Sequence, residues 1–389
     1  WVEAKMDIDY HLRHSALPYP GGERELGKLV ERLHSHPLDM TRPLWECHLI
    51  EGLENRRYAL YFKAHHCAID GMGAVRMLRK WLTPDPTDMD GFFSIGAKPD
   101  HAFHPRPQPT LLERLRKPAR IAAKQAAAFS ELIKTLRIMS AGEDSGARMS
   151  LSTPRSRFNV HVSQQRRLAT QILDLDRLKH VAHATHTTVN DVVLAICGAI
   201  MRRYLIEQES LPEGSLLASV PMGLARSDEK TGNAVAGFVV PLGTNLDDPI
   251  ERLHWINRVT TRSKHELQDM SPAAQTQIAL LGLSPLILGQ MTGLLPKIPP
   301  LFNFVVSNVN LSQEPLYLMG SELEAIYPVS FLFDGYAINI TLVGYNNKVA
   351  IGILGCREAV PSLQRLAVYT RDALGDLEQA VDTQDRHAE

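Results

Sequence analysis

The sequence predicts a mixed α/β fold of two lobes, in each of which helices pack on a mixed sheet. Three observations carry this prediction. Apolar runs with strand spacing and amphipathic segments with helical spacing occur in both halves of the chain, without strict alternation. The chain has 389 residues, 44% hydrophobic and 22% charged, so it can bury two sizeable cores. It contains no Gly-x-Gly-x-x-Gly loop, Walker loop or Gly-x-Ser-x-Gly elbow, which removes several common enzyme classes.

The first block predicts an order of helix, hairpin, motif and helix. Leucine and valine recur at helical spacing within residues 22–36, which predicts an amphipathic helix. Apolar residues 44–50 and 58–65, separated by the polar stretch 51–57, are typical of two strands of a hairpin. Helical spacing then returns over residues 72–82 and stops before two prolines.

The middle of the chain predicts a linker. Residues 83–110 are rich in Pro, Asp and Gly, and residues 111–140 carry seven Lys or Arg against two Glu on an amphipathic segment. This basic helix is either a solvated helix packed by its apolar stripe or a face for phospholipid headgroups or the phosphates of coenzyme A. We therefore place the N-terminal lobe at residues 1–100, the linker with the basic helix at 101–160 and the C-terminal lobe at 161–389.

The second block again mixes strands and helices. Strands are expected at 171–173, 215–222, 234–242, 301–308, 337–345 and 349–354, and helices at 176–184, 189–205, 250–266 and 361–377. The sequence Thr188-Val189-Asn190-Asp191 has the residue types that cap a helix. Residues 278–295 carry no charge before Lys297, and we interpret them as a broken pair of buried helices or a surface for lipid.

Composition limits the partners and the compartment. Lysine plus arginine number 42 against 43 acidic residues, so no global field favours nucleic acid, and we expect no nucleic-acid partner. No signal peptide and no run of about 18 consecutive apolar residues is evident. The four cysteines lie far apart in apolar segments, which indicates a reducing cytosol rather than a disulfide framework: Cys47, Cys67, Cys197 and Cys356.

The strongest chemical signal is His65-His66-x-x-x-Asp70-Gly71, at the predicted end of an apolar strand. Adjacent strand residues point to opposite faces, so one histidine should address a cleft and the other should be structural. Asp70 is placed to hold the loop, and Gly71 permits a positive φ or a close approach. An imidazole can accept a proton from an alcohol as its oxygen attacks a thioester, and no nucleophilic serine is then required.

Two other interpretations of the doublet remain open. A pair of satisfied core histidines beside a turn would give the same sequence. A metal site formed by His65, His66, Cys67 and Asp70 fits less well, because adjacent histidines rarely converge on one ion, and we predict no metal.

Several ordered motifs resemble those of the bacterial wax ester synthase/acyl-CoA:diacylglycerol acyltransferase family, within the chloramphenicol acetyltransferase-like superfamily. Beside the histidine motif, these are Arg42-Pro43-Leu44-Trp45-Glu46, Val189-Asn190-Asp191-Val192-Val193-Leu194, Ser219-Val220-Pro221-Met222, Ser307-Asn308-Val309 and the run from Pro315 through Asp334-Gly335 to Ile338-Asn339. The resemblance spans Trp1 to about Gln379. It implies two lobes with an active-site tunnel between them.

The resemblance also implies roles for single residues. His66 would be the general base that activates the acceptor, within a catalytic motif completed by His65, Asp70 and Gly71, with Asp70 structural. Trp45, Ser307 and Asn339 are candidates for substrate binding, although Trp45 is more often a packing residue. Asn190 and Asp191 would belong to the scaffold.

The implied reaction transfers a fatty acyl group from acyl-CoA to diacylglycerol or a long-chain alcohol, with acyl-CoA as substrate and no cofactor. The implied place is the cytoplasm, peripherally at the inner membrane or at lipid inclusions. A condensation-type acyltransferase on carrier-bound thioesters and a non-catalytic lipid-binding protein are the alternatives. Two departures from the family stand out: a further N-terminal segment with a first strand is expected before Trp1, and Phe331-Leu332-Phe333 is unusually aromatic.

Overall fold

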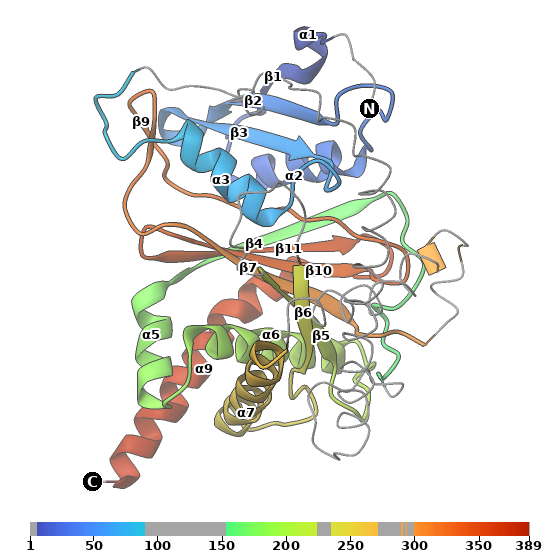
Figure 1. Ribbon diagram of the computed structural model, residues 1–389, viewed down its shortest axis with the longest axis vertical. Coiled ribbons are helices and arrows are strands. Elements are labelled where there is room, and N and C mark those ends of the chain that lie inside the picture. The colour runs from blue at the N-terminus through green and yellow to red at the C-terminus, as the bar shows by residue number, and fades with distance from the viewer. Residues whose placement is uncertain are drawn as a thin grey trace, which may run out of the picture.

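The computed structural model describes residues 6–89, 153–223, 235–270, 289–290, 293 and 299–388. It is layered: a small sheet, two helices beneath it, a large sheet, and a layer of helices on the far side (Figure 1). A mixed sheet with helices in each lobe is therefore confirmed.

The small sheet has three strands in the order β1-β2-β3, with β1 parallel and β3 antiparallel to β2. The predicted hairpin and both predicted helices are confirmed, but the strand β1 was not predicted. In chain order the elements are α1 (Ile8–His11), β1 (Leu12–Ala16), α2 (Glu23–Ser35), β2 (Trp45–Leu53), the turn η1 (Glu54–Arg56), β3 (Arg57–Ala64) and α3 (Gly71–Trp81).

The large sheet has six strands in the order β4-β11-β10-β7-β5-β6. It is mixed, because β10 and β5 run parallel to β7 whereas the other neighbours are antiparallel. Its strands are β4 (Arg166–Asp174), β5 (Leu217–Gly223), β6 (Val235–Pro241), β7 (Phe304–Ser312), β10 (Ile338–Tyr345) and β11 (Lys348–Cys356). The remaining elements are α5 (Leu175–Ala184), α6 (Val189–Glu207), α7 (Pro249–Gln268), the short pair β8 (Tyr317–Leu318) and β9 (Ser321–Glu322), and α9 (Arg365–Ala388).

The two faces of the large sheet have different covers. Ile340 and Leu342 of β10 and Val306 of β7 point into the main core, which α5, α6, α7 and α9 complete. The opposite face carries the alternate residues and meets the small lobe: Val309, Leu311 and Val343 pack with side chains of α3. The lobes thus share apolar contacts, and any residue on that face of β7 or β10 lies on the side of the small lobe.

Helix α2 covers the outer edge of β4. The Glu31 carboxylate accepts a hydrogen bond from the backbone amide of Leu168 at 2.9 Å and one from the Arg167 guanidinium at 3.0 Å. The Ser35 hydroxyl oxygen accepts the backbone amide of Arg166 at 3.0 Å. Backbone donors that a free edge strand would expose are therefore bound by side chains of the other lobe.

Some predictions fall outside the described residues. The basic helix of 111–140 lies there entirely and the uncharged stretch of 278–295 almost entirely, so both stay predictions, as does the lobe division at 100 and 160. Several elements are longer than predicted: β4 begins at Arg166 rather than 171, and α9 runs on to Ala388. Among the helices of the described ranges, none is both long and apolar enough to cross a bilayer.

Candidate active site

The histidine doublet lies in the loop between β3 and α3, just past the strand. Strand β3 ends at Ala64, the His65 amide donates to the Leu44 carbonyl at 2.9 Å, and both rings are exposed. The prediction that strand alternation sends one histidine inward is wrong, because the two residues belong to a turn. Both imidazoles are open to small molecules in solution.

The turn is ordered by contacts within the motif. The Cys67 amide donates to His65 Nδ1 at 3.2 Å, and Cys67 Sγ lies 3.0 Å from the same nitrogen. The Ala68 amide donates to the His65 carbonyl at 2.9 Å. His65 therefore shapes the loop that carries His66.

Asp70 is the N-cap of α3. Its Oδ1 accepts the amide of Gly73 at 2.6 Å, and its carbonyl accepts the amide of Ala74 at 2.8 Å. A capping carboxylate satisfies one of the free amides of the first turn and favours the positive end of the helix dipole.

Gly71 has neither of the two features expected of it. Gly71 is the first residue of α3, and its φ is not positive. A Cβ built there would meet only Val309 Cγ1, at an ordinary 3.7 Å. The glycine that the cap requires is Gly73, where a Cβ would lie 3.0 Å from Asp70 Oδ1. The Gly71–Val309 approach nevertheless places the motif directly over β7.

The His66 ring meets an aromatic side chain from the other lobe. Its centroid lies 5.0 Å from that of Phe331, with the rings inclined by 63° in an edge-to-face arrangement. This geometry is the favoured one for aromatic pairs. The contact links the motif to the segment that precedes β10.

Two of the predicted binding residues are brought together on the face of the large sheet that meets the small lobe. Ser307 lies two residues before Val309 on the same face of β7, and its hydroxyl is 3.1 Å from that of Thr341. Thr341 donates to Asn339 Oδ1 at 2.9 Å. Since that bond uses the one proton of the Thr341 hydroxyl, Ser307 donates to Thr341, and the amide group of Asn339 keeps both N–H donors.

This polar row was only partly visible in the sequence. Ser307 and Asn339 were predicted, whereas Thr341 was missed. The signal that could have found it is the spacing of two from Asn339 along a strand, which puts both side chains on one face. On the same face of β7, Val305 and Val309 place apolar surface on either side of Ser307.

Trp45 lies at the motif end of the small sheet as a packing residue. It is 9% exposed, stacks on His11 with centroids 4.7 Å apart, and lies 6.3 Å from Phe62 in the same manner. Its strand partner is Ala64, the residue before the doublet. Trp45 therefore packs within the small lobe, next to the strand end from which the loop departs.

Asn190 and Asp191 lie at the start of α6, away from the motif. Thr188 is the N-cap of the helix. The carboxylate of the fully buried Asp191 accepts hydrogen bonds from the backbone amide and the hydroxyl of Thr188. The same carboxylate accepts from Asn257 at 2.8 Å and Thr260 at 2.6 Å, both on α7. Burial opposes ionisation of Asp191, but these hydrogen bonds outweigh it and hold its pKa below the usual value.

His34 of α2 is a partly buried histidine that joins the lobes near the motif. Its Nδ1 lies 2.9 Å from the Tyr61 hydroxyl, and its Nε2 lies 2.6 Å from the Ser330 carbonyl. A carbonyl can only accept, so Nε2 carries the proton and Tyr61 donates to Nδ1. The pKa of His34 is lowered to about 4, chiefly because burial disfavours the charged ring. The hydrogen bond to the Ser330 carbonyl raises the pKa, whereas the charges of Lys63 and Arg166 lower it.

We expect His34 to make the fold sensitive to acid. Its pKa of about 4 lies below the value of about 6.5 in an unfolded chain, so between these pH values the unfolded state binds more protons. The free energy of unfolding should fall by up to about 1.4 kcal/mol per pH unit on acidification through this window. Urea titrations at pH 7, 6 and 5 of the wild type and His34→Gln measure the difference in slope. His14→Gln, at an exposed histidine, is the matched control, and equal slopes for all three proteins would contradict the assignment.

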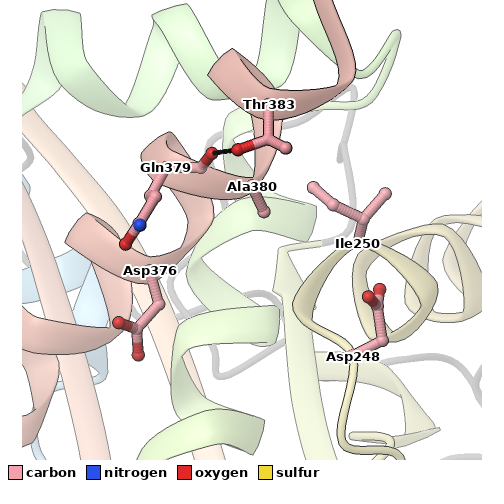
Figure 2. Close-up of a pocket in the computed structure, with 6 residues that line it drawn as sticks. All are labelled: Asp248, Ile250, Asp376, Gln379, Ala380 and Thr383. Carbon is pink, nitrogen blue, oxygen red and sulfur yellow. Dashed lines mark hydrogen bonds between the residues drawn. The ribbon is translucent and has the colours of Figure 1, made fainter. Parts of the chain in front are cut away.

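A surface hollow of about 350 Å³ lies elsewhere, between the start of α7 and the end of α9 (Figure 2). It is lined by Asp248, Ile250, Asp376, Gln379, Ala380 and Thr383. These helices cover the far face of the large sheet (Figure 1), so the hollow does not belong to the motif's site. Within the part of the chain that the structure describes, no group of three His, Cys, Asp or Glu side chains could hold a metal ion.

Comparisons with known proteins agree along the chain. A family model described as the wax ester synthase/diacylglycerol acyltransferase catalytic domain matches residues 1–193, and one described as the WS/DGAT C-terminal domain matches residues 231–378. A putative diacylglycerol O-acyltransferase of Mycobacterium tuberculosis is 52% identical over 380 residues, which cover 98% of this chain and 84% of that protein.

Solved structures agree with the sequence matches. The wax ester synthase/diacylglycerol acyltransferase from Marinobacter aquaeolei VT8 superposes with a TM-score of 0.74 at 36% identity, covering 98% of this chain and 83% of that one. The first condensation domain of the CDA synthetase reaches a TM-score of 0.54 at 17% identity, covering 98% and 78%. The second likeness concerns the fold alone, and together with the first it confirms that the chain has the two-lobed fold of these proteins.

Proposed function

We propose, from the premise that the chain belongs to the wax ester synthase/diacylglycerol acyltransferase family, that His66 is the general base of its reaction. The protein is an O-acyltransferase that transfers a fatty acyl group from acyl-CoA to diacylglycerol or a long-chain alcohol. The condensation-type and non-catalytic alternatives are disfavoured, since the 52%-identical relative is named as a diacylglycerol O-acyltransferase.

The observation that carries the proposal is the position of the His66 imidazole. It is exposed on a loop fixed by the Asp70 cap and by His65, and the motif lies over the strand that bears Ser307. A general base must reach the proton that it removes, and a rigid loop holds it in place. Ser307, Thr341 and the buried Asn339 add a row of polar groups on the face of the large sheet that meets the small lobe.

The chemistry requires one proton shuttle. His66 takes the hydroxyl proton of the acceptor while the hydroxyl oxygen forms a bond to the thioester carbonyl carbon. The resulting tetrahedral oxyanion collapses by breaking the carbon–sulfur bond. The coenzyme A thiolate leaves and takes the proton back from the imidazolium, so the base is restored. The thioester is already activated, and direct transfer therefore needs no cofactor.

The place of action follows from the substrates in this proposal. Diacylglycerols and long-chain alcohols partition into membranes and lipid inclusions, so the enzyme would work in the cytoplasm with its site turned towards such a surface. Cosedimentation with phosphatidylglycerol vesicles addresses this part of the proposal independently of turnover.

The direct test is an acceptor competition. Purified protein receives palmitoyl-CoA with hexadecanol, with dipalmitoylglycerol, or with neither, and ester products and free coenzyme A are quantified by chromatography. We expect ester formation with at least one acceptor, in equal amount to the coenzyme A released. Release of coenzyme A that is independent of acceptor, or no ester with either, would contradict acyl transfer.

A further inference from the structure

A line of aromatic rings begins at His66 and leads into the large lobe. Phe331 is 5.0 Å from His66 between ring centroids, and Phe333 is 6.0 Å from Phe331. Tyr336 follows at 4.6 Å from Phe333, and Phe302 at 4.5 Å from Tyr336. Each spacing lies within the range of direct aromatic contact.

The rings become more buried with distance from His66. Phe331 is 45% exposed, whereas Tyr336 is 3% and Phe302 6% exposed within a small apolar cluster that also contains Val305. A single exposed apolar side chain is common on a protein surface, so the informative feature of Phe331 is its ring contact with His66. The outer end of the line presents apolar surface beside the base.

Phe331 is held in place by both lobes. The preceding Ser330 carbonyl accepts a hydrogen bond from His34 of the small lobe, and Val329 packs against the core of that lobe. On the other side, the Pro328 carbonyl lies so close to β11 that a Cβ at Gly352 would be 1.8 Å from its oxygen, so only glycine fits. The segment before Phe331 is thus fixed, and its exposed ring does not belong to a loose surface loop.

We propose that Phe331 and Phe333 form a wall that contacts the alkyl chain of a substrate close to its reacting carbon, and that Phe331 sets the preference for long chains. This inference rests on the proposed function of His66. The ligand chemistry is an unbranched alkyl chain, which either the acyl donor or the alcohol acceptor could supply. Because Phe331 adjoins the base, a chain that leaves the reacting carbon in this direction meets Phe331 first and Phe333 next.

The expected effect depends on chain length. Burying one methylene contributes about 0.8 kcal/mol, so the loss of a ring that covers two or three methylenes should lower kcat/KM about tenfold or more for long chains. A two-carbon chain does not extend past the reacting centre and loses little. A substitution that merely disturbed His66 would lower turnover equally for every chain.

The experiment compares Phe331→Ala and Phe331→Leu with the wild type in two arms. In the donor arm acetyl-CoA and palmitoyl-CoA are compared at fixed hexadecanol, and in the acceptor arm ethanol and hexadecanol are compared at fixed palmitoyl-CoA. Ile206→Ala, at a 50% exposed residue of α6, is the matched control. Phe331→Ala should lose about tenfold for the long chain in one arm and less than twofold for its short partner. Phe331→Leu should retain most of the preference, because an apolar side chain remains.

The arm that responds identifies which substrate supplies the alkyl chain. Equal losses for short and long chains in both arms, or no loss, would overturn the proposal. Calorimetric binding of the thioether S-hexadecyl-CoA, of S-butyl-CoA and of hexadecanol distinguishes this result from failure of the proposed function. If the wild type forms no ester, acyl transfer fails, yet a Phe331-dependent affinity for a hexadecyl chain still supports the wall, and an unchanged affinity for all three ligands overturns it.

Discussion

Replacing His66 by alanine should lower acyl transfer by about a hundredfold to ten-thousandfold, the usual loss when a general base is removed. The fold should be unaffected, because the side chain is exposed and the loop is held by Asp70, His65 and Cys67. The measurement is kcat/KM with palmitoyl-CoA and the better acceptor, beside a thermal unfolding curve. Circular dichroism of the variant should match that of the wild type.

The neighbouring histidine provides the matched control. His65→Asn keeps an acceptor for the amide of Cys67, so the loop should retain its shape and activity should stay within about tenfold of the wild type. A folded His66→Ala protein with near-normal turnover, or a larger loss at position 65 than at 66, would show that the base has been assigned to the wrong residue.

Asp191→Asn should destabilise the large lobe by about 3 kcal/mol at pH 7, within the range for breaking a buried charged hydrogen-bond network. The carboxylate accepts four hydrogen bonds, from the amide and hydroxyl of Thr188 and from Asn257 and Thr260. An asparagine can place its NH₂ group at the Oδ1 position, towards the Thr260 hydroxyl, but its neutral oxygen accepts the other three hydrogen bonds more weakly than a carboxylate does. Urea unfolding followed by fluorescence measures the loss, since Trp255 of α7 lies against the main core.

The same prediction has a pH dependence with a defined sign. Hydrogen bonds hold the pKa of Asp191 below its usual value, so its contribution is present above an unfolded value of about 3.9 and is lost as the pH falls through the lower folded value. The gap between wild type and variant should therefore stay constant from pH 7 to 5 and narrow only at strongly acid pH. Asp247→Asn, at a carboxylate that is 94% exposed, is the control and should leave the urea midpoint unchanged.

Local pattern was sufficient for the elements that carry the motif. The amphipathic spacing of residues 22–36, the hairpin and the capping signal at Thr188 all correspond to observed elements, because each depends on neighbours in the chain. Strand β1 was missed because its five residues, Leu-Arg-His-Ser-Ala, contain one large apolar side chain and pair in parallel with a strand more than thirty residues later. No local signal announces such pairing.

The site was predictable as a motif but not as an assembly. The sequence identifies His66 and Asp70, and it suggests Ser307 and Asn339, yet the link through Thr341 depends on the register between β7 and β10. The contact between His66 and Phe331, and the tie from His34 to Ser330, join residues 265 and 296 positions apart. Such contacts follow from how the lobes dock, which no spacing rule encodes.

Glu31 and Ser35 also affect how copies of this protein can meet. By occupying the backbone amides of Leu168 and Arg166 from within the same molecule, they hinder strand addition along the first part of β4. Edge-to-edge joining of sheets from many molecules is a route to insoluble fibres. The hydrogen bonds from Glu31 and Ser35 that join the lobes therefore also protect this edge of the sheet. A variant that removes one of them, such as Glu31→Ala, should lose an interlobe hydrogen bond and also become more prone to aggregation.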